Sequence, residues 1–423
     1  MRKLFTLFLL IPFVQPLAAQ DCSNGRYGVE LFTDVDITSD VVYGNNTNLL
    51  GVPQDLMLDV YQPSGDTETD RPLVIVAHGG SFVTGSKTGA DVVPLCTDLA
   101  ERGYVVASIN YRLGIEDLLV PANLDSVDGA EAVIRGFHDS KAAIRFFYRD
   151  VIENGNTYNI DTNNIYFGGA SAGGFNALNI AYLDKMSEYP AFVDDTKASV
   201  DAGIEGNSGN AGFSSDVRAI FNIAGAIYDT NWIEAGSIPV LSLHGDQDGT
   251  VPFGTDIIVV FGTPMLPVDG SESVHARATN IGLQNCFKVQ MGQDHVPHVS
   301  DADQYDTLLT MTVNYLSSFV CNLPNAFCNE SGIVLSDEPL VVDQQVLDVY
   351  PNPATDRVQV TLPANTSGTT LLEMIDPSGR TVREVRTEQS GNIWVDRNGL
   401  PAGLYLLRIR NAQSVHTAKV LWE

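Results

Sequence analysis

Residues 163–178, NNIYFGGASAGGFNAL, combine an apolar run, a turn of small residues and the start of a helical pattern. The run resembles a buried strand, because it holds one β-branched and two aromatic side chains. The turn places Ser171 in the pattern G-x-S-x-G, which exposes a serine Oγ between a strand and a helix. Small residues also suit any sharp bend, so the pentapeptide by itself leaves a structural and a chemical explanation open.

Similar apolar runs recur along the first three quarters of the chain, and helical patterns separate several of them. The apolar runs are residues 72–80, 104–112, 164–171, 217–225 and 238–246, and the helical patterns include residues 91–103 and 139–154. Buried strands that alternate with helices predict a doubly wound, mainly parallel α/β sheet that is covered on both faces.

The chain of 423 residues is longer than one average domain. Residues 322–345 are polar and acidic without a clear period, which predicts a linker. Residues 346–423 contain short alternating runs broken by turn residues, which predicts a small β-sandwich. We therefore expect an α/β domain over residues 20–321, followed by the linker and the sandwich.

Residues 1–19 have the composition of a secretory signal peptide. Two basic residues precede an apolar core, and small residues follow near Ala18 and Ala19. The apolar core is shorter than the roughly 20 residues that a transmembrane helix needs. We expect no membrane span and an exported, secreted or surface-bound protein that passes through the periplasm.

Charge and cysteine content support the same compartment. The net charge of −28 opposes nucleic acid or an anionic membrane as a partner. Five cysteines fit an oxidising compartment, and their odd number leaves at least one unpaired within the chain. Their spacing does not reveal the disulfide connectivity. It also gives no paired metal-ligand motif, so we expect no metal and no cofactor.

A nucleophilic serine requires a histidine as its base and an acid that orients the histidine. Two aspartates, Asp246 and Asp248, follow the apolar run that ends near His244, and two histidines, His295 and His298, follow a later run. Each has an ordinary explanation, such as a turn-forming aspartate or a capping histidine. The order serine, acid, histidine nevertheless matches the order required in hydrolases of this topology.

The segment HGGSFVTG, which starts at His78, follows the first long apolar run. Backbone N–H groups of such a glycine turn can face a cavity and stabilise negative charge on a tetrahedral oxygen. The bend of the backbone alone explains the glycines. It does not explain the sequence His-Gly-Gly-x-Phe ahead of a serine turn. His138 and Asp139, in a helical pattern, are expected to be structural.

The segments HGGSFVTG, GGASAGGFNAL, HGDQDGTVP and GQDHVP resemble the α/β-hydrolase fold, and specifically its carboxylesterase branch, over residues 40–320. The resemblance implies that Ser171 is the nucleophile, His295 the base and Asp248 the acid, with Asp246 the less favoured acid. It also implies that the backbone N–H groups of Gly80, Ser81 and Ala172 form the oxyanion hole. Many members have a third glycine where Ser81 stands.

The tail resembles a second family. The segments VYPNPATDRVQV, DPSGR and LPAGLYLLRI are similar to the type A C-terminal sorting domain of the type IX secretion system of Bacteroidetes. This resemblance implies that the secretion machinery is a partner. A carbohydrate-binding β-sandwich is the alternative interpretation.

Together these patterns predict a secreted serine carboxylic-ester hydrolase that works through an acyl-enzyme. The expected substrates are short-acyl or aryl esters, such as acetyl or feruloyl esters, free or carried on a polymer. Two alternatives stay open, a serine peptidase of the same fold and a non-catalytic binding protein. We expect residues 113–137 and 185–216 to border the pocket as loops or a partial cap.

Overall fold

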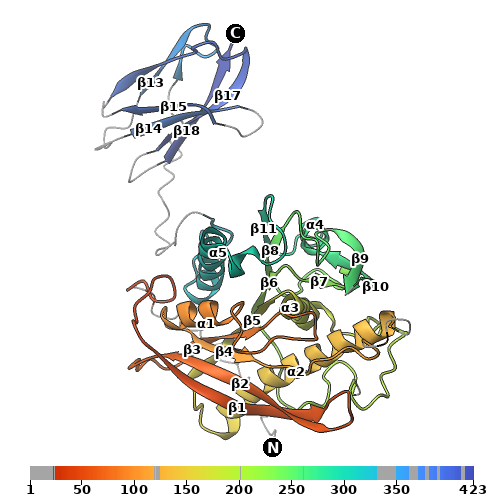
Figure 1. Ribbon diagram of the computed structural model, residues 1–423. Coiled ribbons are helices and arrows are strands. Elements are labelled where there is room, and N and C mark those ends of the chain that lie inside the picture. The colour runs from red at the N-terminus through yellow and green to blue at the C-terminus, as the bar shows by residue number, and fades with distance from the viewer. Residues whose placement is uncertain are drawn as a thin grey trace, which may run out of the picture. The chain divides into compact units, whose positions relative to one another are not determined.

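A computed structural model describes residues 22, 24–118, 120, 124–200, 202–260, 262–330, 349–361, 370–376, 381–387, 391–410 and 415–423. The chain divides into two compact units, Met1–Ser336 and Asp337–Glu423, and each is described by itself (Figure 1). The predicted signal peptide and residues 331–345 of the predicted linker lie outside the described residues.

The first unit is built on an eight-stranded sheet with the order β1-β2-β4-β3-β5-β6-β8-β11. Strands from β4 to β11 are parallel to their neighbours in that order, whereas β2 pairs antiparallel with both β1 and β4. The strands are β1 (Val35–Thr47), β2 (Pro53–Pro63), β3 (Arg71–Ala77), β4 (Val105–Ile109), β5 (Ile160–Ala170), β6 (Ala219–Ile223), β8 (Val240–Gly245) and β11 (Asn285–Gln290).

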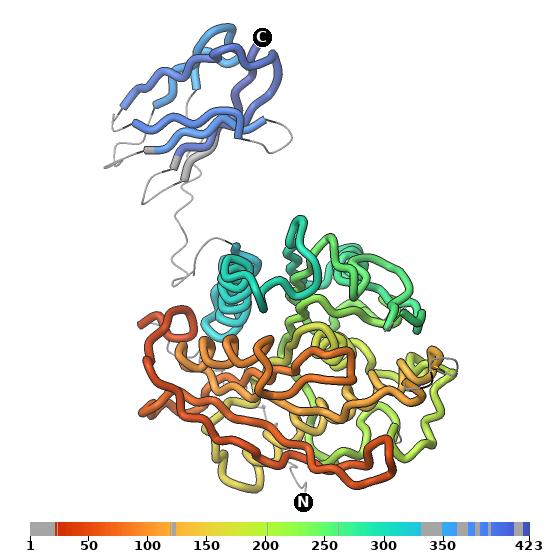
Figure 2. The backbone as a smooth tube through the Cα atoms, viewed as in Figure 1, coloured from red at the N-terminus to blue at the C-terminus, as the bar shows by residue number. Residues whose placement is uncertain are grey.

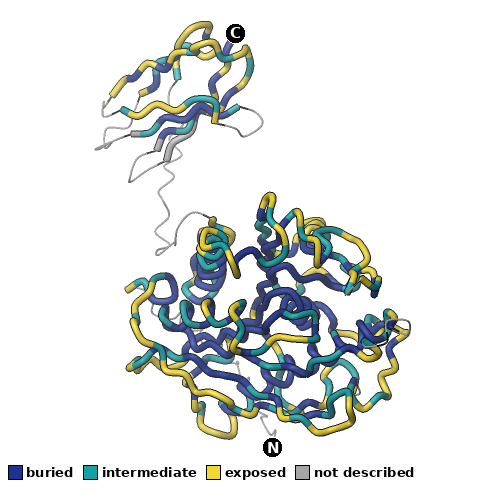
Figure 3. Tube along the Cα trace, in the orientation of Figure 1, coloured by how far each residue is buried: buried dark blue, intermediate teal, exposed yellow. Residues whose placement is uncertain are grey.

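The predicted α/β fold is confirmed, and the five apolar runs form β3, β4, β5, β6 and β8. The sequence patterns did not predict the antiparallel pair β1–β2 at the edge of the sheet. Strand β1 is largely exposed and rich in polar residues, so it lacks the continuous apolar run of the central strands. Figure 3 shows the contrast between the buried central strands and this exposed edge.

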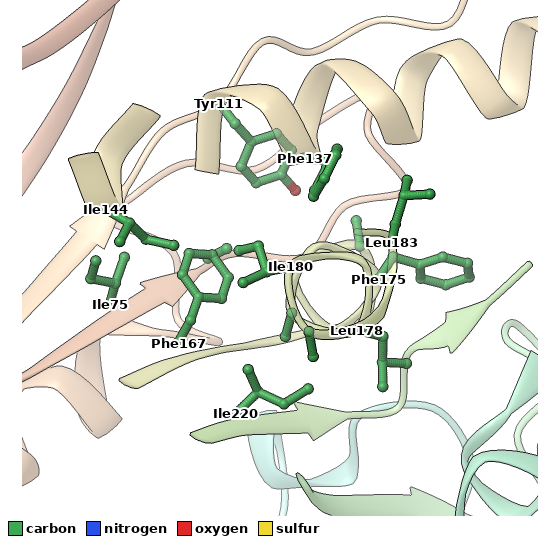
Figure 4. Close-up of a cluster of buried hydrophobic side chains, with 14 of the residues drawn as sticks. Ile75, Tyr111, Phe137, Ile144, Phe167, Phe175, Leu178, Ile180, Leu183 and Ile220 are labelled. Atoms are coloured by element: carbon green, nitrogen blue, oxygen red, sulfur yellow. The ribbon is translucent and has the colours of Figure 1, made fainter. Parts of the chain in front are cut away.

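Helices cover both faces of the sheet, as Figure 2 allows the reader to follow along the chain. Helices α2 (Ser126–Glu153) and α3 (Ala172–Tyr182) pack on one face, and α1 (Val93–Ala100) and α5 (Ala302–Val320) pack on the other. Successive residues of β3 enter the two apolar cores alternately, as the period of a strand requires. In Figure 4 the side chains of Phe167, Leu178 and Ile220 belong to the core around α3.

Helix α2 is much longer than predicted, because it begins at Ser126 rather than near Asp139. The helix begins with a capping box. The Asp125 carboxylate accepts hydrogen bonds from backbone N–H groups of the first turn, and the Asp128 carboxylate accepts one from the Asp125 backbone N–H. Gly129 and Gly136 weaken the helical pattern of this part of the helix, but at Gly136 the helix packs closely against its neighbours. A Cβ on Gly136 would lie 2.7 Å from Asn176 Oδ1. Residues 113–137 were expected to form loops or a partial cap, and the loop alternative is wrong for the part that belongs to α2.

A smaller sheet and two disulfides complete the first unit. The sheet has the order β7-β10-β9, from β7 (Ala226–Ile227), β9 (Thr255–Val260) and β10 (Thr263–Gly270), and it lies beside α4 (Ser271–Asn280). Disulfides join Cys22 to Cys321 and Cys286 to Cys328. Cys96 is the unpaired cysteine and is buried.

The second unit consists of two antiparallel sheets that enclose an apolar core. One sheet contains β12 (Val349–Tyr350), β13 (Arg357–Thr361) and β16 (Asn392–Asp396), and the other contains β15 (Thr381–Thr387), β14 (Thr370–Ile375), β17 (Gly403–Arg410) and β18 (Val415–Trp422). Val358 and Ile393 of the first sheet share this core with Leu372 and Leu407 of the second. This confirms the predicted β-sandwich.

Candidate active site

Ser171 lies at the bend between β5 and α3, with a backbone φ of 53°. A non-glycine residue rarely adopts this conformation, so the surrounding packing must hold it. The glycines on either side allow that packing: a Cβ would lie 2.4 Å from Ala77 O at Gly169 and 2.0 Å from the same oxygen at Gly173. The small residues of G-x-S-x-G are therefore required for the close approach of β5, α3 and β3.

The structure brings Ser171, His295 and Asp248 into one hydrogen-bonded chain. The Nε2 atom of His295 lies 2.9 Å from Ser171 Oγ, and its Nδ1 atom lies 2.7 Å from Asp248 Oδ2. Each residue follows the carboxyl end of a parallel strand, β5, β8 or β11, so all three meet at the same edge of the sheet. A serine, an imidazole and a carboxylate in this order can transfer a proton from the hydroxyl group.

The side chain of Asp248 is fully buried and accepts several hydrogen bonds. Its Oδ1 atom accepts from the backbone N–H groups of Thr250 and Val251, each at 2.8 Å. Burial acts to raise the pKa of Asp248, but hydrogen bonds from His244 and His295 outweigh burial and hold this pKa well below its usual range. The carboxylate therefore stays ionised at neutral pH.

The two alternative residues, Asp246 and His298, lie outside this chain. The Asp246 carboxylate accepts from the backbone N–H of Gly292. His298 is buried in the short 3₁₀ turn Pro297–Val299, and among the described residues no hydrogen bond joins it to Ser171. Burial lowers the pKa of His298 to about 4, although nearby Asp91 acts in the opposite direction.

The glycine loop after β3 lies directly against the serine. A Cβ on Gly79 would lie 3.2 Å from Ser171 Cβ, and φ is positive at Gly80 and Ser81. In the part of the chain that the structure describes, no hydrogen bond occupies the backbone N–H of Gly80, Ser81 or Ala172. These donors are therefore available to an oxygen atom bound beside Ser171.

Sequence reasoning missed three residues that support this arrangement. The Asp91 carboxylate accepts from the Gly79 backbone N–H at 2.6 Å, and the Tyr111 hydroxyl donates to His78 O at 2.7 Å. His244 contacts Asp248 from β8. Asp91 stands just before helix α1, where an aspartate is an ordinary helix-start signal, so its place in the sequence does not indicate its contact with the loop.

His138 and Asp139, expected to be structural, are buried on α2 away from the serine. Asp139 pairs with Arg112 at 2.8 Å, with both side chains fully buried. His138 bonds through Nε2 to Gly203 O at 2.7 Å. Burial lowers the pKa of His138 to about 4.

A largely apolar cavity opens onto Ser171 and includes about 550 Å³ of space with its opening to solvent. Its apolar walls come from α2, α3, the β9–β10 hairpin and the loops after β3 and β4. The apolar residues are Phe82, Ile115, Val133, Phe175, Ile258, Val259, Val260, Met265 and Leu266. Ile115, Gly129 and Val133 thus border the cavity, as expected for residues 113–137, whereas none of the described residues between 185 and 216 lines it. Within the described ranges, no group of three or more His, Cys, Asp or Glu side chains is arranged to hold a metal ion.

Two parts of the chain match models of known protein families. Residues 58–226 match the family BD-FAE. The first unit has the α/β-hydrolase fold and is similar to esterases. Residues 348–423 match the family described as "Secretion system C-terminal sorting domain". The tail of the chain is therefore a secretion sorting domain.

Curated relatives of the hydrolase domain include carboxylesterases and also a neuroligin-like protein, glit-1 of Caenorhabditis elegans, which is 32% identical over 99 residues, or 23% of this chain and 12% of that protein. The chain is 30% identical over 189 residues to carboxylesterase 3 of Pongo abelii, a match that covers 40% of this chain and 31% of that protein. It is 34% identical over 120 residues to carboxylesterase 3B of Mus musculus, over 28% of this chain and 19% of that protein. The chain thus spans about a third or less of the length of these relatives.

Among solved structures, esterase 2 of Thermogutta terrifontis phosphorylated by paraoxon is similar to the hydrolase domain. The match has 20% identity and a TM-score of 0.46, and it covers 69% of this chain and 96% of that chain. Separately, no helix among the residues described here is both long and apolar enough to cross a membrane.

Proposed function

We propose that the hydrolase domain is a serine carboxylic-ester hydrolase. The observation that carries this proposal is the continuous hydrogen-bonded chain from Ser171 Oγ through His295 to Asp248. Beside it lie an apolar cavity and backbone N–H groups that donate to no acceptor among the described residues. The similarity to carboxylesterases supports the ester as substrate.

In the proposed reaction, Ser171 Oγ attacks the ester carbonyl carbon while His295 Nε2 takes the hydroxyl proton. The carbonyl oxygen becomes an oxyanion, which accepts hydrogen bonds from the N–H groups of Gly80, Ser81 and Ala172. The tetrahedral intermediate then expels the alcohol, to which His295 returns the proton, and an acyl-enzyme remains. Water attacks the acyl-enzyme with His295 again as base, which releases the acid and restores Ser171. Asp248 holds the imidazole and stabilises its cation.

The cavity supports an uncharged, apolar acyl or aryl group as the part of the substrate bound beside Ser171. Aliphatic and aromatic side chains dominate its walls, and burial of apolar surface favours such groups by about 25 cal/mol per Å². A charged group would lose its hydration without a compensating partner. Short-acyl esters and aryl esters of the feruloyl kind therefore fit the proposal.

We also propose that residues 1–19 direct export to the periplasm and that the sorting domain, from about residue 346, engages the type IX secretion machinery. The match of residues 348–423 to the sorting-domain family supports this assignment. The proposed location of the mature enzyme is therefore outside the cell or on its surface, where polymer-borne esters are accessible.

The test is hydrolysis of p-nitrophenyl esters from acetate to palmitate and of a feruloyl ester, with wild type beside Ser171→Ala. We expect activity on short or aryl esters that Ser171→Ala lacks, and labelling of Ser171 by a fluorophosphonate. A p-nitroanilide of the same acyl group separates the peptidase alternative, which predicts comparable amide cleavage. Equal activity in wild type and Ser171→Ala would overturn the proposal, and inactivity without labelling would favour the binding protein.

A further inference from the structure

Asp248 has two histidine neighbours, and the proposed reaction uses only one of them. His244 Nε2 lies 3.1 Å from Asp248 Oδ2, the same oxygen that His295 Nδ1 approaches at 2.7 Å. His244 is completely buried on β8, so it cannot contact solvent. The two imidazoles therefore approach one carboxylate oxygen from the buried side and from the serine side.

The partners of His244 determine where its proton lies. Its Nε2 atom faces two acceptors, Asp248 Oδ2 and Val251 O at 3.3 Å, so this nitrogen must carry the hydrogen. Its Nδ1 atom lies 2.8 Å from Ser271 Oγ. Ser271 Oγ accepts from the Asn222 side-chain amide at 3.0 Å, so its own proton is free to point at Nδ1.

These contacts form a single chain of donors that runs from Asn222 through Ser271 and His244 to Asp248. With the hydrogen of His244 on Nε2, each donor in this series of hydrogen bonds faces an acceptor. The chain is fixed by three elements, because Asn222 lies on β6, Ser271 begins α4 and His244 lies on β8. Its last donor points at the carboxylate oxygen that orients His295.

We propose that His244 is a positioning residue, which holds the Asp248 carboxylate in place through its Nε2–H and shares the negative charge that Asp248 presents to His295. This inference rests on the proposed function, since it assigns Asp248 as the acid that orients His295. His244 itself does not touch the substrate or the reacting atoms.

Removal of the His244 donor is expected to change the pH profile of kcat/KM. Without the His244 donor, more of the Asp248 charge is available to stabilise protonated His295, so the base is lost at a higher pH. The other charged group near this pair is Asp294, whose Oδ1 accepts from the backbone N–H groups of Gly249 and His295. His298 also lies within electrostatic range of His295. These groups are unchanged in the variants below, so they do not account for a difference.

The experiment compares kcat, KM and the pH profile of kcat/KM for wild type, His244→Leu, His244→Gln and Ser271→Ala. Leucine removes the donor, glutamine restores a side-chain N–H, and Ser271→Ala removes the contact behind the ring. His275→Leu is the matched control, because His275 is a half-buried histidine on α4 that bonds to Asn285 and not to the site.

We expect His244→Leu to lower kcat about 10- to 100-fold, the range that outer partners of other functional histidines contribute. We also expect little change in KM and an acid limb displaced to higher pH. His244→Gln should recover most of kcat, Ser271→Ala should give a smaller effect in the same direction, and His275→Leu should leave the profile unchanged. A folded His244→Leu with the wild-type pH profile and kcat would overturn the proposal.

An unfolded His244→Leu variant and an inactive wild type lead to different conclusions. If His244→Leu fails to fold, His244→Gln and Ser271→Ala decide. An unchanged acid limb in Ser271→Ala together with a kcat of His244→Gln far below that of the wild type contradicts the proposal. If the wild type shows no Ser171-dependent activity, the proposed function fails. In that case the ring protonation of His295, followed by NMR in the same variants, still tests whether His244 acts on the Asp248–His295 pair.

Discussion

The backbone N–H of Gly79 donates a 2.6 Å hydrogen bond to Asp91 Oδ2. Gly79 also lies against Ser171, where an added Cβ would come within 3.2 Å of the serine Cβ. Asp91 therefore connects the start of the α1 segment to the loop that carries the proposed oxyanion donors. The position of that loop therefore depends on a carboxylate 12 residues further along the chain.

Asp91→Ala should lower kcat about 10- to 100-fold with a smaller effect on KM. Loss of one oxyanion donor typically costs about 3 kcal/mol of barrier, and a displaced loop loses part of that stabilisation. Steady-state kinetics on a p-nitrophenyl ester measures the effect. Asp91→Asn keeps one oxygen acceptor and should be milder, whereas a wild-type kcat in Asp91→Ala would show that the loop holds its position without this contact.

Phe175→Ala should move the preference of the enzyme toward longer acyl chains. Phe175 lies between the cavity at Ser171 and a second apolar cavity, because Val133, Phe175 and Leu266 line both. Each additional buried methylene is worth about 0.8 kcal/mol, or roughly fourfold in kcat/KM. Hydrolysis of butyrate, hexanoate, octanoate and decanoate esters measures the shift.

A substitution that adds volume at a neighbouring position gives the control for acyl-chain length. Val133→Phe fills the space between the two cavities and should reduce hydrolysis of the longer esters without a comparable loss for acetate. An identical chain-length profile in wild type, Phe175→Ala and Val133→Phe would mean that the acyl group does not enter this region.

Gly173→Ala should prevent stable folding or strongly destabilise the hydrolase domain. Its Cβ would lie 2.0 Å from Ala77 O, and the backbone of β3 has no room to move away. Gly249→Ala is the matched control, since its Cβ would meet only Asp294 Oδ1 at 3.8 Å. Thermal unfolding of both variants measures the difference, and equal melting temperatures would contradict the steric argument.

Stability of the hydrolase domain should fall as the pH falls from about 6.5 to about 4. Burial lowers the pKa of His138 from 6.5 to about 4 and that of His298 to a similar value. The folded state keeps both rings neutral while the unfolded chain takes up protons, so acidification favours unfolding in this window. A shift of about 2.5 pKa units corresponds to roughly 3 kcal/mol for each ring.

Urea unfolding at pH 7.5, 6, 5 and 4 measures this dependence. His138→Gln should make it shallower by up to one proton, because a glutamine amide can still donate to Gly203 O and does not titrate. A free energy of unfolding that stays constant from pH 7 to pH 4.5 would show that these histidines are solvated or paired in the folded state.

Much of the fold was predictable because the central strands bury both faces. Their continuous apolar runs separated by helical segments indicate a parallel sheet, and β3, β4, β5, β6 and β8 lie where those runs predicted. The exposed strand β1 and the first turns of α2 were not predictable in the same way. A polar edge strand lacks an apolar run, and the glycines of α2 weaken a helical pattern for the sake of contacts made elsewhere in the fold.

The sequence by itself determined the serine turn, the order of the acid and histidine candidates, the glycine loop, and the two-unit organisation of an α/β domain and a β-sandwich. These features depend on local spacing and composition, which the chain carries directly. Only the tertiary structure joined His295 to Asp248 rather than to Asp246, and only it brought His244 and Asp91 to the site. His295 lies 47 residues from Asp248 along the chain, whereas Asp91 and His244 lie 12 and 4 residues from their partners. In each case the path of the folded backbone decides the contact, because hydrogen bonds act over only a few ångströms in space.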